Sequence, residues 1–119
     1  MQNNHWLKQQ LQAISDWRLQ RISALLLAPL SIWLIVFLQK CLHGSFADVW
    51  QWLHNPINRL GVFGWLLIAL YHAALGCQVV LEDYVSNIPL RHRAIDVSRG
   101  VFLLIMALVL AVFVLIQIR

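Results

Sequence analysis

The sequence predicts an all-α membrane protein with three transmembrane helices, preceded by an N-terminal amphipathic segment at the membrane interface. Hydrophobic residues make up 61% of the 119 residues and charged residues only 12%, a composition unlike that of soluble proteins. Residues 22–38, 60–81 and 100–118 contain no Asp, Glu, Lys or Arg, and each stretch approaches the roughly 20 residues that a spanning helix needs. We expect one membrane-anchor domain over residues 1–119, with spans at about 22–39, 60–84 and 99–118.

The N-terminal segment, residues 1–21, is predicted to form a helix on the membrane surface. Apolar residues recur in it near the helical period: Trp6, Leu7, Leu11, Ile14 and Trp17. Ser15 or Asp16 is a candidate cap for the helix that follows. Because no small-residue cleavage site follows the first apolar stretch, we expect an uncleaved protein.

Two prolines mark the next segments. Pro29 lies inside the first span, where a modest kink is expected because proline removes one backbone donor. In the 40–59 loop, Trp50 and Trp52 favour a position in the headgroup layer, and Asn55-Pro56 is expected to end any short helix and start the second span. No glycine-rich phosphate loop is present in the sequence, and we expect no nucleic-acid partner.

The basic residues predict the orientation in the membrane. Six of the nine lie before the first span or around the second loop, and three lie in the first loop or at the C-terminus. Positive residues favour the cytoplasm, so we expect a cytoplasmic N-terminus and a periplasmic C-terminus in a bacterial inner membrane. The two sets are Lys8, Arg18, Arg21, Arg91, Arg93 and Arg99, against Lys40, Arg59 and Arg119.

His72 is the first candidate site residue, because it lies near the middle of the second span, where an ionisable side chain is costly. One imidazole nitrogen can bind haem iron while the other donates to a carbonyl or a side chain. Gly76 and Ala69 lie one turn away on either side and leave clearance for a flat macrocycle. The alternative is a histidine that only bridges helices, with both small residues serving close packing.

Asp83 and Tyr84 end the same span. Eleven residues separate His72 from Asp83, which puts both on one face about 16 Å apart along the helix. A site at the cytoplasmic interface, with Tyr84 as a phenol donor, would then lie below a cofactor in the membrane. The alternatives are an interfacial belt tyrosine and a solvated helix end.

Arg21 is the third candidate, at the entry to the first span. An arginine that faces inward there can pair with an anion such as a haem propionate or a partner's acid. The alternative is an ordinary positive anchor at the membrane surface.

These segments resemble the hydrophobic membrane anchor subunit of succinate:quinone oxidoreductase, respiratory complex II. The resemblance covers about residues 15–119 and depends mainly on the pattern His-x3-Gly-x6-Asp-Tyr, which His72, Gly76, Asp83 and Tyr84 match. The stretch "DWRLQRISALLLAPLSIW" is also similar. Some members have a histidine at the position of Ser15, and this sequence departs from them there.

The resemblance implies a haem b shared with a second membrane anchor subunit of the cytochrome b type, and attachment to an iron–sulfur subunit and a flavoprotein subunit. It implies that His72 is an axial ligand of the haem iron, that Gly76 belongs to the haem site and that Arg21 faces a propionate. Tyr84 would donate to ubiquinone, with Asp83 supporting that site. Succinate oxidation itself would take place on the flavoprotein.

Two other functions remain open at this point. One is the anchor of a fumarate reductase, which works in the opposite direction. The other is a haem-free structural membrane subunit, in which His72 only joins two helices.

Overall fold

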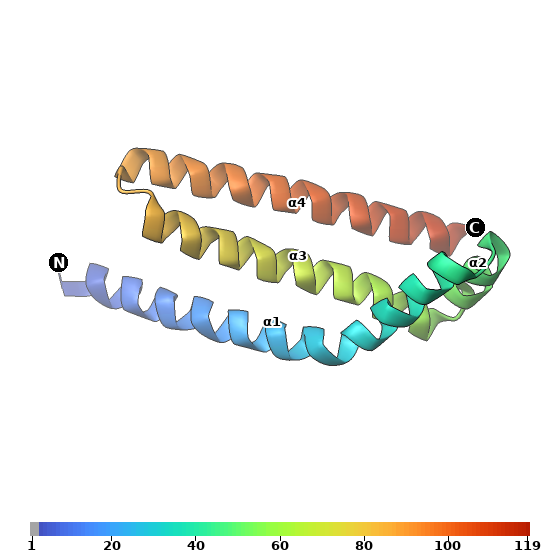
Figure 1. Ribbon diagram of the computed structural model, residues 1–119. Helices are drawn as coiled ribbons and strands as arrows, with labels where there is room; N and C mark the ends of the chain where they lie inside the picture. The colour runs from blue at the N-terminus through green and yellow to red at the C-terminus, as the bar shows by residue number, and fades with distance from the viewer. Residues whose placement is uncertain (1–2) are drawn as a thin grey trace.

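The computed structural model describes residues 3–119, which form four helices and no strand (Figure 1). The helices are α1 (Asn3–His43), α2 (Phe46–His54), α3 (Pro56–Tyr84) and α4 (Ile88–Ile118). Three of them, α1, α3 and α4, are long and apolar enough to cross a membrane. The predicted all-α fold with three spans is confirmed.

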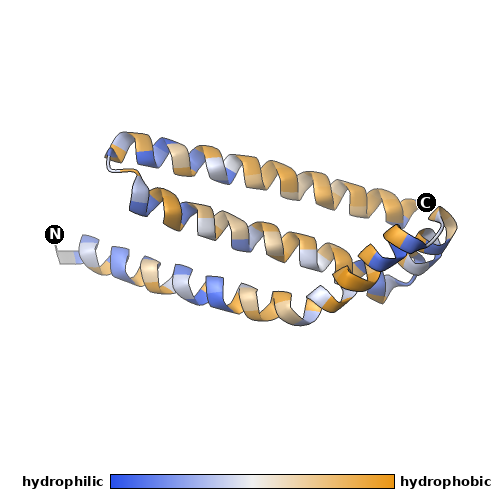
Figure 2. Ribbon diagram, in the orientation of Figure 1, coloured by the Kyte–Doolittle hydropathy of each residue, from blue (hydrophilic) through white to orange (hydrophobic). Residues whose placement is uncertain are grey.

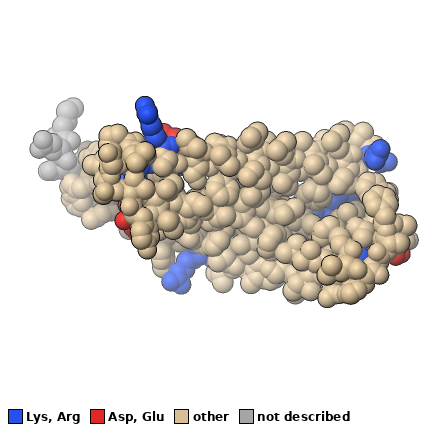
Figure 3. All heavy atoms as spheres, turned by 45° about the horizontal axis from the view of Figure 1, so that its top comes forward, with Lys and Arg blue, Asp and Glu red and all other residues tan. Residues whose placement is uncertain are grey.

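The three long helices lie side by side, with α3 between α1 and α4 (Figure 1). The N-terminus and the α3–α4 connection lie at one end of the bundle, and α2 and the C-terminus lie at the other. Apolar residues fill most of α4, while polar residues gather toward both ends of the bundle (Figure 2). On the face in Figure 3, Lys and Arg side chains lie only toward the two ends. This distribution fits a bundle whose middle lies in lipid.

The N-terminal segment is helical over its described residues, but it is continuous with the first span. The cap expected at Ser15 or Asp16 is wrong, because both residues lie inside α1. No glycine or proline occurs before Pro29 to stop the helix, and Gln12 Nε2 donates to Asp16 Oδ1 one turn away at 3.1 Å. At 1.5 Å per residue α1 is roughly 60 Å long, about twice the bilayer core, so part of it extends beyond the membrane. Residues 1 and 2 lie outside the described residues.

Pro29 lies inside α1, as expected, and Figure 1 shows α1 curving between its N-terminal and C-terminal halves. The curve brings the C-terminal half of α1 against the start of α3. There Gly61 permits close approach, since a Cβ at this position would lie 2.5 Å from Cγ of Trp33. On the other side of α3, the rings of Phe63 and Phe113 meet edge to face with centroids 5.1 Å apart.

The loop between the first two spans contains α2, whose start is fixed by a capping box. Asp48 N donates to Ser45 Oγ at 3.2 Å, and Ser45 N donates to Asp48 Oδ2 at 2.8 Å. Hydrogen bonds from the Ser45 hydroxyl and backbone lower the pKa of the Asp48 carboxyl. Asn55 caps α3 through Ile57 N, and Pro56 occupies its first turn, so the expected start of the second span is confirmed.

Little of the chain is buried within itself. Among the described residues the buried hydrophobic side chains are Leu53, Val62 and Ile95, and many large apolar side chains are exposed. Ser23, 4% exposed, is the buried polar residue of this part of the chain. Such exposure is expected where lipid and other subunits cover the surface.

Candidate functional site

The candidate site is centred on a contact between α1 and α3. Ser23 Oγ lies 2.8 Å from His72 Nδ1 and 2.8 Å from the carbonyl oxygen of Gln20. A carbonyl oxygen only accepts, so the single hydroxyl proton of Ser23 points to Gln20. With the hydroxyl donating to Gln20, its oxygen is the acceptor of the second bond, and Nδ1 is the donor in the matching tautomer of His72.

This arrangement determines the state of the other imidazole nitrogen. With the proton on Nδ1, Nε2 of a neutral imidazole carries a lone pair. Within residues 3–119 no hydrogen bond to Nε2 is found. His72 thus bridges two helices, as the structural alternative expected, and still keeps one nitrogen free to act as a metal ligand.

A recess of about 340 Å³ opens beside His72. It is lined by Gln20, Arg21, Ala24, Leu25 and His72. The guanidinium carbon of Arg21 lies 4.8 Å from the centre of the Trp17 ring, a cation–π contact on the exposed side of α1. The structure therefore brings the His72 imidazole and the Arg21 guanidinium to one opening.

Gly76 lies one turn from His72 and is half-buried against α1. A Cβ at this position would lie 3.8 Å from Gln20 Nε2, an ordinary van der Waals distance. Packing within this chain therefore does not require glycine here, in contrast to Gly61. Space at this point remains available for a group that does not belong to the chain.

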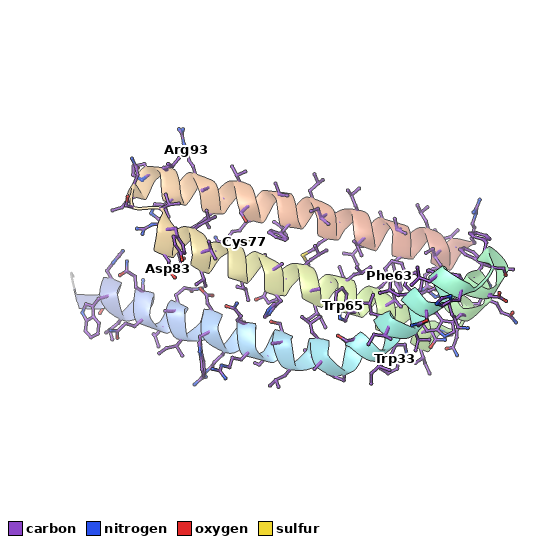
Figure 4. All side chains as sticks on the ribbon, in the orientation of Figure 1. Trp33, Phe63, Trp65, Cys77, Asp83 and Arg93 are labelled. Atoms are coloured by element: carbon purple, nitrogen blue, oxygen red, sulfur yellow. The ribbon has the colours of Figure 1, made fainter. Side chains whose placement is uncertain are left out.

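Asp83 and Tyr84 lie at the end of α3, away from the recess. Tyr84 is 84% exposed, and Asp83, which is labelled in Figure 4, is also exposed. Neither side chain makes a hydrogen bond to the residues that the structure describes. The helix rises about 18 Å from His72 to Tyr84 at 1.5 Å per residue, so the chain holds two separate groups of candidates.

The part of the chain described contains no group of three or more His, Cys, Asp or Glu side chains placed to hold a metal ion. His72 is a single nitrogen donor, so a six-coordinate iron would need its second axial ligand from another chain. Sequence reasoning missed Ser23, because a serine in an apolar helix is usually satisfied by its own backbone. Which face of α1 meets α3 is not determined by any local sequence pattern, so the sequence held no signal for this contact.

Comparisons with known proteins add the family. The family described as "Succinate dehydrogenase/Fumarate reductase transmembrane subunit" matches residues 2–116. The chain belongs to this family.

Relatives of this transmembrane-subunit family include the succinate dehydrogenase hydrophobic membrane anchor subunit of Rickettsia bellii, 41% identical over 102 residues, which cover 82% of this chain and 78% of the relative. The subunit of the same name from Rickettsia conorii is 36% identical over 99 residues, covering 82% and 79%. The one from Coxiella burnetii is 35% identical over 76 residues, covering 64% and 66%. No solved structure matches.

The resemblance inferred from the sequence is therefore confirmed: this member of the transmembrane-subunit family is a membrane anchor subunit of succinate dehydrogenase. It works in a complex with other subunits of the enzyme. The large exposed apolar surface of the bundle agrees with that role.

Proposed function

We propose that this anchor subunit holds haem b together with a second membrane anchor subunit and contributes to the site where ubiquinone is reduced. The observation that carries the proposal is the 2.8 Å contact of His72 Nδ1 with Ser23 Oγ, which leaves Nε2 of His72 without a partner among the described residues. A neutral imidazole with one fixed N–H is the usual form of a histidine ligand to iron. The donor type, the adjacent cation and the small residue at Gly76 all fit a haem.

Each residue would have a separate role. His72 would supply one axial nitrogen, and the partner anchor would supply the other. Arg21 would leave the Trp17 ring or extend past it to pair with a propionate, because a guanidinium matches a carboxylate in a bidentate geometry. Haem supplies a one-electron carrier near the middle of the membrane when it is bound.

The quinone site would lie at the other group of residues. Tyr84 is exposed at the end of α3, where its phenol can donate a hydrogen bond to a ubiquinone carbonyl oxygen. Asp83 precedes it and can orient a cationic side chain of this chain or of a partner. Electrons would arrive from a flavoprotein subunit through an iron–sulfur subunit, and the reduced quinone oxygens would take up two protons from the cytoplasmic side.

Two alternatives are separated by different observations. A fumarate reductase anchor belongs to the same family description, but the relatives reported above are named as succinate dehydrogenase subunits, which favours succinate oxidation. A haem-free structural subunit is supported by the Ser23–His72 bridge alone. The reduced-minus-oxidised spectrum of the purified complex tests the haem-free alternative. A b-type band is expected, and the absence of haem would overturn the proposed function.

The proposed location is the bacterial inner membrane, with the N-terminus in the cytoplasm. Cys41 is exposed in the last turns of α1, at the end of the bundle that holds α2. A membrane-impermeant thiol reagent added from the periplasm should label Cys41 but not a cysteine introduced by Ser86→Cys. The reverse labelling pattern would invert the topology and move the quinone site to the periplasmic side.

A further inference from the structure

We infer that Ser23 is a positioning residue for His72: its hydroxyl holds the imidazole in the tautomer, and at the angle, that present Nε2 to the recess beside Arg21. This inference rests on the proposed haem function and assigns a role that neither the family pattern nor the sequence singled out. Ser23 would touch neither the iron nor the macrocycle. It acts through the Nδ1–H bond alone.

The direction of the bond follows from the two contacts of Ser23. The hydroxyl has one proton, and the Gln20 carbonyl oxygen at 2.8 Å accepts it. The 2.8 Å contact with Nδ1 is then a hydrogen bond only if His72 is the donor. The backbone of α1 thus selects the Nδ1–H tautomer through Ser23. In the opposite tautomer the hydroxyl would have to leave the Gln20 carbonyl in order to donate to Nδ1.

Burial makes this selection effective. Ser23 is only 4% exposed, and His72 is half-buried, so water has little access to replace the bond. The contact joins two spans rather than two neighbours on one helix, since 49 positions separate the residues. The ring angle therefore depends on the packing of α1 against α3.

The bond also affects the electronic character of the ligand. An acceptor on Nδ1–H raises the basicity of the imidazole and favours the oxidised form of the iron it binds. Removing the acceptor should raise the midpoint potential of the haem. It should also weaken haem retention, about 10- to 100-fold for typical outer partners of metal ligands.

The chain offers a matched control. Trp65 Nε1 donates to Ser31 Oγ at 3.0 Å, and Ser31 Oγ donates to the Leu27 carbonyl oxygen at 2.7 Å. This second contact also joins α1 to α3 through a serine bonded to its own helix. Ser31→Ala removes the same kind of bond without touching His72.

The experiment compares the intact complex carrying Ser23→Ala, Ser23→Thr or Ser31→Ala with the wild type. Redox titration of the haem band and haem retention against an apo-globin acceptor are measured for each. We expect a raised potential and faster haem loss in Ser23→Ala, wild-type values in Ser31→Ala, and near wild-type values in Ser23→Thr, because threonine keeps the hydroxyl.

The outcomes separate this inference from the proposed function. If the wild type holds no b-type haem, or if His72→Ala leaves the spectrum unchanged, the proposed function itself fails. If His72 proves to be the ligand but Ser23→Ala keeps the wild-type potential and retention, only the role of Ser23 is overturned. Equal effects of Ser23→Ala and Ser31→Ala would also overturn it, because the loss would then reflect general packing between the helices. Loss of all haem in Ser23→Ala, with normal retention in Ser31→Ala, would support it.

Discussion

The two halves of α3 differ in how they meet the rest of the chain. The half that follows Pro56 holds Gly61 and Val62, which are buried, and Trp65, whose single ring nitrogen is satisfied by Ser31. The half that ends at Tyr84 holds His72, which makes the same type of bond to Ser23 but has a second nitrogen left over. Figure 4 shows Trp33, Phe63 and Trp65 together toward one end and Asp83 at the other. We name these the packing half and the open half.

The difference shows which side chains of so small a chain remain available to bind a ligand. Indole has one N–H and no acceptor, so the Trp65 contact uses its polar capacity fully and contributes only to helix packing. Imidazole has two nitrogens, so an equivalent contact to a serine leaves a ligand free. Substitutions in the packing half should therefore change stability, and those in the open half should change function.

The largest expected effect is at the end of the open half. Tyr84→Phe keeps the ring and removes the hydroxyl, and a bond to a developing quinone anion contributes about 1.5–3 kcal/mol. Ubiquinone turnover should fall about 10- to 150-fold. Because Tyr84 is 84% exposed in this chain, the thermal stability of the complex should hardly change.

The matched measurement for Tyr84→Phe is succinate oxidation with an artificial acceptor that takes electrons upstream of quinone. That rate should stay normal, since the flavoprotein and the clusters are untouched. If the variant reduces ubiquinone at the wild-type rate with unchanged apparent affinity, Tyr84 is an interfacial belt residue. This end of the open half would then take no part in quinone reduction.

The packing half is tested at Gly61. Gly61→Ala places a Cβ 2.5 Å from Cγ of the Trp33 ring. Because this distance is too short, α1 and α3 must separate or the ring must turn. Overpacking of this kind costs about 1–3 kcal/mol. We expect a lower melting temperature of the complex with an unchanged haem spectrum. In Gly76→Ala the new Cβ meets only an ordinary contact within the chain. This variant should keep the melting temperature of the complex and change the haem spectrum.

A smaller effect is expected for Trp65→Phe, which removes the hydrogen bond to Ser31 and part of the ring. Hydrogen bonds between helices in a membrane contribute on average about 0.6 kcal/mol. Denaturant titration of the complex in mild detergent should show a free energy of unfolding that is lower by about this amount because the bond is missing. A change in haem potential as large as that of Ser23→Ala would break the distinction between the halves.

The smallest effect lies outside α3, in the capping box of α2. Hydrogen bonds to Ser45 lower the pKa of Asp48, so they stabilise the start of α2 above the usual carboxyl pKa. That stabilisation is lost as the pH falls through the lowered pKa. Amide exchange at residues 45–49, corrected for intrinsic rates, should rise in acid for the wild type. Asp48→Asn should remove this dependence, and a variant that keeps it would assign the transition to another group.

Much of the fold could be predicted from the sequence, because charge-free runs of bilayer length leave a helix as the simplest way to satisfy the backbone. Asn55-Pro56 also gave the start of α3 correctly. The cap at Ser15 or Asp16 was wrong because a capping residue acts only where the helix stops, and no residue between Trp6 and Ile22 stops it. Local residue preference does not show whether two helical segments join.

The candidate site was predicted only in part. His72 stands out because an ionisable group at the middle of a span is expensive, and this signal lies in the sequence itself. Its bond to Ser23 depends on how α1 crosses α3, which no local pattern determines. For the same reason Arg21 could be placed on a helix, but its position beside His72 could not.

The most direct test of the account is the spin state of the haem iron in the complex carrying His72→Ala. The purified complex is compared with the wild type and with Trp65→Phe by low-temperature electron paramagnetic resonance. Loss of one axial nitrogen should turn the low-spin signal of the wild type into a high-spin signal or leave the haem weakly held, whereas Trp65→Phe should keep the wild-type signal. An unchanged low-spin signal in His72→Ala would mean that the free nitrogen of the open half is not the ligand.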